Sequence, residues 1–177
     1  YFYGLQGEIS RILRHIPEIE HLYFDKREEI PKEKRKIGSI VITADKGLAG
    51  AYNHNIVKVE DELLKEPGEH KLFVVGELGR HYYANKGVKI DTDFLYTVQK
   101  PTMHRARDIA EEIFSQFREG ELDEVYIVYT RMENSMLTMV EKMKILPLER
   151  SSFNEMKMPI NIHREAIALY PSAEAVL

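Results

Sequence analysis

The chain has 177 residues, a formal net charge of -4 and a hydrophobic content of 44%, which describe one globular domain of ordinary composition with attached segments. The acidic balance gives no general attraction to nucleic acid, and no apolar stretch approaches the length needed to cross a bilayer. Because there is no cysteine, disulfides, thiolate metal sites and cysteine nucleophiles are excluded.

The chain begins with an expected helix and a charged connector. Apolar residues recur at helical spacing from Leu5 to Ile16, and Pro17 stops the pattern. Residues 17–37 are rich in charge and interrupted by proline, so we assign residues 1–37 to the end of a helix and a solvated connector. Residues 164–177 read as the start of another helix. We therefore expect the parent protein to continue on both sides as long amphipathic helices.

Residues 38–163 alternate between strand and helix patterns. The β-branched run Ile40-Val41-Ile42 is typical of a strand that is covered on both faces. Strands are expected at 38–43, 71–76, 88–90 and 125–129, and helices at 51–65, 79–85 and 101–120. From Leu137 to Leu148 the apolar period changes to two, which predicts a long, half-exposed strand added antiparallel. The pattern predicts an α/β, Rossmann-like three-layer domain with a mixed, mostly parallel sheet.

The turn after the first strand carries the most specific pattern in the chain. Gly47 and Gly50 allow positive φ or a close backbone approach, and Asp45 is suited to cap the helix that follows. The predicted structural turn motif consists of Asp45, Lys46, Gly47, Leu48, Gly50, Tyr52 and Asn53. The exposed amides of such a turn can bind phosphate, which keeps a free-standing nucleotide-binding α/β enzyme as the alternative. However, the Gly-x-x-Gly spacing matches neither the dinucleotide fingerprint nor the phosphate loop.

Few residues suggest catalysis. The seven histidines include no pair four residues apart, and no serine lies in a Gly-x-Ser-x-Gly elbow. His54 near Asp45 could act as a base, but a solvent-facing or capping role is favoured. The turn from Gly76 to Gly79 follows a strand and resembles a ligand turn, yet Glu77 would repel a phosphate there. We expect no catalytic residue, cofactor, metal ion or direct small-molecule ligand.

The strand at 137–148 is the expected partner surface. Its apolar residues at odd positions are expected to bury one face, whereas its lysines at even positions stay wet and able to meet an acidic partner. The candidate surface consists of Leu137, Met139, Lys142, Met143 and Lys144.

The turn motif resembles the gamma subunit of rotary F-type ATP synthases. In that family the first strand of the central domain runs into Ser-Asp-basic-Gly-Leu-Cys/Ala-Gly-Gly/Ala-Tyr-Asn, which this chain matches from Asp45 to Asn53, with Ala44 in place of the serine. The resemblance extends over nearly the whole chain. It implies truncated ends of coiled-coil helices at 1–37 and 164–177, around the α/β domain at 38–163.

The same resemblance implies a function and partners. The subunit would be the central rotor stalk of the ATP synthase, coupling proton-driven rotation to ATP synthesis in the catalytic subunits while catalysing nothing itself. Its partners would be the alpha and beta catalytic-head subunits, the epsilon subunit and the c-subunit ring, with no nucleic acid. It would lie at the cytoplasmic face of the cell membrane through the complex. The edge at 137–148 is the expected epsilon contact.

Overall fold

The computed structural model describes residues 7, 9–13, 22–24, 30–46, 50–94, 98, 100–133 and 137–149. The chain divides into two compact units, Tyr1–Lys26 with Pro147–Leu177, and Arg27–Leu146, and each is described by itself. In the first unit, residues 9–13 are helical, and the short 3-10 helix η1 spans Leu22–Phe24. The N–H of Leu148 donates to the carbonyl of Tyr23 at 2.6 Å. The predicted coiled-coil ends fall largely outside the described residues, and the predicted domain boundaries stay a prediction.

The second unit is built on one five-stranded sheet in the order β3-β2-β1-β4-β5. The strands are β1 (Lys36–Ile42), β2 (Glu69–Val75), β3 (Thr92–Phe94), β4 (Glu124–Met132) and β5 (Thr138–Leu146). Strand β1 pairs in parallel with β2 and β4, β2 pairs in parallel with β3, and only β5 runs antiparallel to its neighbour within this sheet. The predicted mixed, mostly parallel sheet is confirmed.

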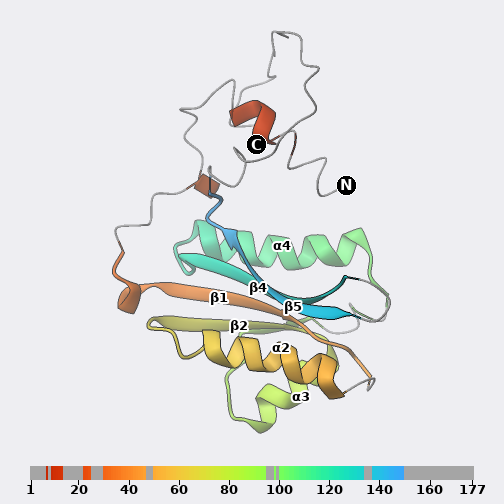
Figure 1. Ribbon diagram of the computed structural model, residues 1–177. Coiled ribbons are helices and arrows are strands. Elements are labelled where there is room, and N and C mark those ends of the chain that lie inside the picture. The colour runs from red at the N-terminus through yellow and green to blue at the C-terminus, as the bar shows by residue number, and fades with distance from the viewer. Residues whose placement is uncertain are drawn as a thin grey trace. The chain divides into compact units, whose positions relative to one another are not determined.

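Helices cover both faces of the sheet. The helical elements are η3 (Lys32–Lys34), α2 (Gly50–Leu63), α3 (Glu77–Asn85) and α4 (Met103–Arg118). Helix α4 lies on one face, and α2 and α3 lie on the other, which gives the predicted three layers (Figure 1). Helix α4 starts as expected from its sequence, because the Thr102 hydroxyl accepts from the Arg105 amide at 3.3 Å. It ends before Gly120, whose φ of 76° suits glycine.

The third strand lies later in the chain than predicted. Residues 88–90 form no strand, and β3 begins at Thr92. Val88 and Ile90 instead pack against the buried cluster that lies between the sheet and α2. The N–H of Asp91 donates to the carbonyl of Leu72 at 2.8 Å, so the backbone reaches β2 only after these two apolar side chains are buried. Their alternation therefore reflects helix-layer packing and not strand pairing.

The prediction that the odd-numbered apolar residues of β5 are buried is wrong. Leu137, Met139 and Met143 are 47%, 46% and 38% exposed. The residues that face inward are Val140, which packs against the buried cluster, and Leu146, which is 2% exposed. Helix α2 packs against β5 on the side of Val140, whereas a register shift between Val125 and Tyr126 places Leu146 opposite Val125. As the edge strand, β5 leaves its other face open.

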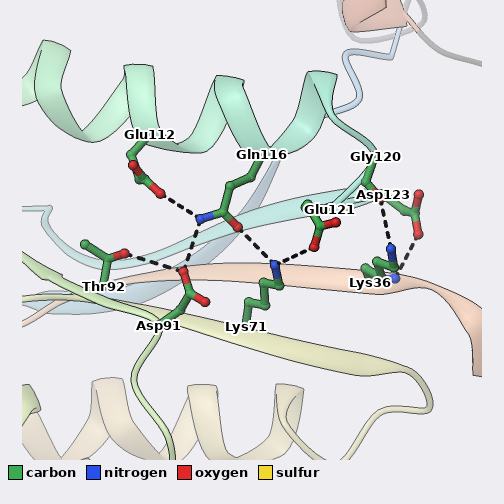
Figure 2. A network of polar contacts seen from close by, with 9 residues as sticks. All are labelled: Lys36, Lys71, Asp91, Thr92, Glu112, Gln116, Gly120, Glu121 and Asp123. Atoms are coloured by element: carbon green, nitrogen blue, oxygen red, sulfur yellow. Dashed lines mark hydrogen bonds and ion pairs between the residues drawn. The ribbon is translucent and has the colours of Figure 1, made fainter.

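A polar network fastens the C-terminal end of α4 to the sheet (Figure 2). The Lys71 ammonium in β2 donates to Gln116 Oε1 at 3.3 Å and to Glu121 Oε2 at 3.0 Å. The Gln116 amide in turn donates to Asp91 at 3.1 Å and to Glu112 at 2.7 Å. The hydrogen bond from Lys71 lowers the pKa of the Glu121 carboxyl. The network ties α4 to the amino-terminal side of β2 and β3.

Candidate functional site at the carboxyl end of β1

The chain leaves β1 through Thr43, which joins the ends of two strands to a helix. Its N–H and its hydroxyl both donate to the carbonyl of Val75, at 2.8 and 3.0 Å. The same hydroxyl accepts from the N–H of Gly79 at 2.9 Å. Thr43 is 1% exposed, so these bonds form in a dry environment. One buried side chain thus links β1, β2 and α3.

The first turn of α3 is satisfied by the segment that follows β1. The N–H of Glu77 donates to Asp45 Oδ1 at 3.1 Å, and the N–H of Leu78 donates to the carbonyl of Ala44 at 3.0 Å. With the bond from Gly79 to Thr43, three amides at this helix N-terminus have internal partners. These are the groups that bind phosphate in nucleotide sites. We call this arrangement the β1–α3 lock.

Two glycines make the lock possible. Gly76 has φ of 103°, and a Cβ there would lie 2.3 Å from the Thr43 carbonyl oxygen. At Gly79 a Cβ would lie 2.7 Å from Thr43 Oγ1 and 2.9 Å from Val74 Cγ1. Any larger side chain would push α3 away from the strand ends. The turn from Gly76 to Gly79, which resembles a ligand turn in sequence, is therefore a close-packing turn.

The predicted turn motif is only partly described by the structure. Helix α2 begins at Gly50, well past Asp45, so Asp45 cannot occupy the N-cap of α2 and bonds to the start of α3 instead. Asn53 reaches back from α2, and its Oδ1 accepts from the N–H of Ala44 at 3.1 Å. Lys46 is exposed. Gly47 and Leu48 lie outside the described residues, as does the side chain of Tyr52.

No catalytic constellation appears in the described part of the chain. His54 is exposed on α2, as the favoured solvent-facing interpretation predicts. No group of three histidine, aspartate or glutamate residues within the described ranges could hold a metal ion. None of the described helices is long and apolar enough to cross a membrane.

The candidate partner surface divides between the two faces of β5. Met139 and Met143 project from the open face, whereas Lys142 and Lys144 share the even-numbered face with Val140. The Lys142 ammonium pairs with Glu66 at 3.2 Å and lies 5.4 Å from the centroid of the Tyr126 ring.

Sequence reasoning missed the residues that complete the lock and one buried acid. Thr43 follows an apolar run, and nothing in the sequence around it indicates that its side chain joins two strands to a helix. The pair Gly76 and Gly79 did indicate the turn. Glu60 lies in α2 and is 0% exposed, and Ile56 and Leu63 on the same side of the helix are 0% and 1% exposed. Its spacing from Ile56 and Leu63 is the helical spacing of that buried stripe, so a search for charged residues on apolar faces finds it.

The fold and the lock define a class: a doubly wound α/β domain in which the segment after β1 is bonded to the end of β2 and to the start of α3. A family model described as ATP synthase matches residues 1–177, so the chain belongs to the ATP synthase family, and its curated relatives are gamma chains.

Several relatives and structures resemble the chain. It is 39% identical to the ATP synthase gamma chain of Caldanaerobacter subterraneus subsp. tengcongensis, over 86% of this chain and 51% of the relative. It is 42% identical to that of Ruminiclostridium cellulolyticum, over 88% and 52%. The chain thus spans about half the length of these relatives. The central stalk and c-ring structure of the Tetrahymena thermophila mitochondrial ATP synthase contains a chain with the same fold, at a TM-score of 0.60 and 21% identity, covering 96% of this chain and 70% of that one.

Proposed function

We propose that the chain supplies the globular part of the central rotor stalk of an F-type ATP synthase. It would couple ion-driven rotation to ATP synthesis in the alpha and beta subunits without catalysing a reaction itself. The observation that carries this proposal is the family match over residues 1–177. The β1–α3 lock supports it, because three amides at the start of α3 are bonded to Thr43, Ala44 and Asp45 and are not free to bind a phosphate. The names of the relatives, all ATP synthase gamma chains, support the same role.

The architecture suits a part that carries torque. Strand β1 lies at the centre of the sheet between two parallel neighbours, and Ile40 and Val41 are buried on its two faces. Close-packed layers of this kind deform little and transmit strain. The lock at one end of the strands and the Lys71 network at the other hold helices to the sheet at both ends of the strands. The domain would therefore move as a stiff body between the c-subunit ring and the catalytic head.

The β5 edge is the proposed contact for the epsilon subunit. An edge strand offers unpaired backbone groups to a partner strand, and exposed methionines adapt to irregular partner surfaces. Leu137, Met139 and Met143 supply the apolar part of this surface, while Lys142 and Lys144 lie on its other side. An acidic partner strand that paired with β5 would contact both the apolar residues and the lysines. The full complex would lie at the cytoplasmic face of the membrane, which makes this chain peripheral through its partners.

The driving ion is part of the proposal. Proton coupling is the expected form, and one relative, 33% identical over 84% of this chain, is named as the sodium ion specific gamma chain of Acetobacterium woodii. This chain contributes no ion-binding carboxylate cluster within its described residues.

Calorimetric titration with ATP and with ADP tests the non-catalytic role against the nucleotide-binding alternative. We expect no stoichiometric binding. A site tighter than about 10 μM, which corresponds to about 7 kcal/mol, would favour the enzyme alternative. A variant that opens the lock, Thr43→Val, is the matched control, since it frees the Gly79 amide. Binding by the variant alone would show that the lock is what excludes the nucleotide.

A further inference from the structure

A carboxylic acid lies under the centre of the sheet. Glu60 projects from α2 toward β1 and is 0% exposed. Its Oε1 accepts a hydrogen bond of 2.5 Å from the hydroxyl of Ser39, which is also 0% exposed. Its Oε2 is buried and has no hydrogen-bond partner. The acid is thus held by a single hydrogen bond from one strand.

The buried core in the same layer is formed by apolar side chains and one phenol. The buried cluster between α2, α3 and the sheet contains Val41, Ile56, Val57, Tyr83 and Val128, among others. Tyr83 is 0% exposed, and its hydroxyl also has no hydrogen-bond partner. Burial raises the pKa of Tyr83, and charge on Glu60 raises it further. The phenol is therefore neutral and cannot balance a charge on Glu60.

The charged groups near Glu60 are already engaged elsewhere. On α2, Asp61 accepts from the Tyr82 hydroxyl at 3.0 Å and pairs with Lys86 at 2.5 Å. On β5, the Lys142 ammonium pairs with Glu66 at 3.2 Å. Strand β1 contributes the neutral Ser39 hydroxyl, and α3 contributes the neutral Tyr83. Strand β4 places Tyr126 opposite Ser39, and the Tyr126 hydroxyl donates to Glu124 at 2.9 Å. No ion pair neutralises Glu60 within the described part of the chain.

This environment favours the neutral acid. An ionised carboxylate needs several donors, whereas a neutral carboxyl is satisfied by fewer partners. Burial raises the pKa of Glu60 from 4.5 to about 7, with a smaller increase from Asp61, while the Ser39 hydrogen bond and the charge of Lys142 lower it. We therefore expect the acid to change its charge near neutral pH.

We propose that Glu60 and Ser39 form a buried proton-binding site, and that uptake of a proton by Glu60 tightens the docking of α2 on the sheet. The ligand is a hydrogen ion, and the responding element is the α2 layer beneath β1, β4 and β5. The site is independent of the rotor role, because it follows from the burial and the hydrogen bonding of Glu60. It makes the stiffness of the domain depend on pH: α2 is held more tightly at pH 6 than at pH 8.5.

Carbon-13 NMR of the glutamate carboxyls, with Glu60 assigned through Glu60→Gln, tests the site directly in the 177-residue chain. We expect one carboxyl to titrate near pH 7. The Ser39→Ala variant should raise that midpoint, because it removes the hydrogen bond that stabilises the charged form. Glu62→Gln on the exposed side of the same helix, where Glu62 pairs with Lys65 at 2.7 Å, should leave the midpoint unchanged. A Glu60 midpoint between 4 and 5, or no titration up to pH 9, would overturn the proposal.

Hydrogen exchange of the α2 amides tests the coupling to docking. If the closed state titrates near 7 and the opened state at 4.5, the opening equilibrium rises about tenfold between pH 6 and 8.5, after correction for intrinsic exchange rates. Glu60→Gln should abolish this increase and Glu62→Gln should retain it. An equal increase in the Glu60→Gln variant would show that another group controls α2.

Discussion

Replacing Gly79 by alanine tests the β1–α3 lock, because it sets helix propensity against close packing. Gly79 lies in α3 without a positive φ, so alanine can adopt its backbone conformation. Propensity alone predicts a gain of about 1 kcal/mol for glycine to alanine inside a helix. The structure predicts the opposite sign, since the new Cβ would lie 2.7 Å from Thr43 Oγ1, 2.8 Å from Thr43 Cγ2 and 2.9 Å from Val74 Cγ1.

The magnitude follows from three contributions. Overpacking of this kind costs about 1 to 3 kcal/mol, because the crowded atoms belong to a buried threonine and a core valine. Displacing α3 also weakens the hydrogen bond from Gly79 to Thr43, which costs about 1 kcal/mol. The propensity gain offsets about 1 kcal/mol. The net loss is about 2 kcal/mol, which lowers the melting temperature by about 4 to 8 °C for a chain of this size.

Urea unfolding followed by circular dichroism measures this loss. The matched control is Ala84→Gly on the exposed face of α3, which reports propensity alone and should cost about 1 kcal/mol. Both variants should be destabilised, with Gly79→Ala the more affected. If Gly79→Ala is instead more stable than the parent by the amount that Ala84→Gly loses, propensity governs the position and the close packing of the lock is refuted.

Three further predictions concern charge and the turn. Glu60→Gln should stabilise the domain by up to about 3 kcal/mol at pH 8 and little at pH 4.5. The pKa of Glu60 is about 7 in the folded state and 4.5 in the unfolded state, so the parent loses stability as the pH rises between these values. Denaturant midpoints measured across this pH range check the sign. Gly47→Val should cost about 1 to 3 kcal/mol, more than a change at exposed His104, and an unchanged denaturant midpoint would show the turn to be ordinary. Reversing Lys142 and Lys144 to glutamate should weaken assembly with the epsilon subunit and the c-subunit ring, as measured by co-sedimentation. The domain should stay folded, because the exposed ion pair of Lys142 contributes at most about 1 kcal/mol to its stability. Full assembly of the variant would show that this surface is not the contact.

The sheet was predictable because its strands are short apolar runs of the kind that parallel sheets bury on both faces. The run Ile40-Val41-Ile42 marked the central strand, and the helix expected at 101–120 contains α4 (Met103–Arg118). The third strand was misplaced because Val88 and Ile90 have the alternation of a strand but fill the helix layer. Periodicity reports which side chains are buried and does not report what buries them.

The faces of β5 and the partners of Asp45 could not be read from the chain. Alternation of apolar residues does not identify which face of an edge strand a helix covers, and α2 covers the face of Val140 and not that of Met139. Asp45 was expected to cap the next helix in sequence, but parallel strands bring the start of α3 to the same edge of the sheet. The bond between Ser39 and Glu60 likewise depends on how α2 lies on β1.

The proposal that this chain is a coupling part of the rotor can be tested by exchange into a complete gamma subunit. Residues 1–177 would replace the corresponding segment of the Caldanaerobacter gamma chain, which is 39% identical over the matched region. The assembled ATP synthase would then be measured in vesicles for ATP hydrolysis and for ion pumping in the same preparation. We predict that ATP hydrolysis drives ion pumping, with a ratio of ions pumped to ATP hydrolysed close to that of the parent complex. Hydrolysis without pumping in a fully assembled complex would contradict it.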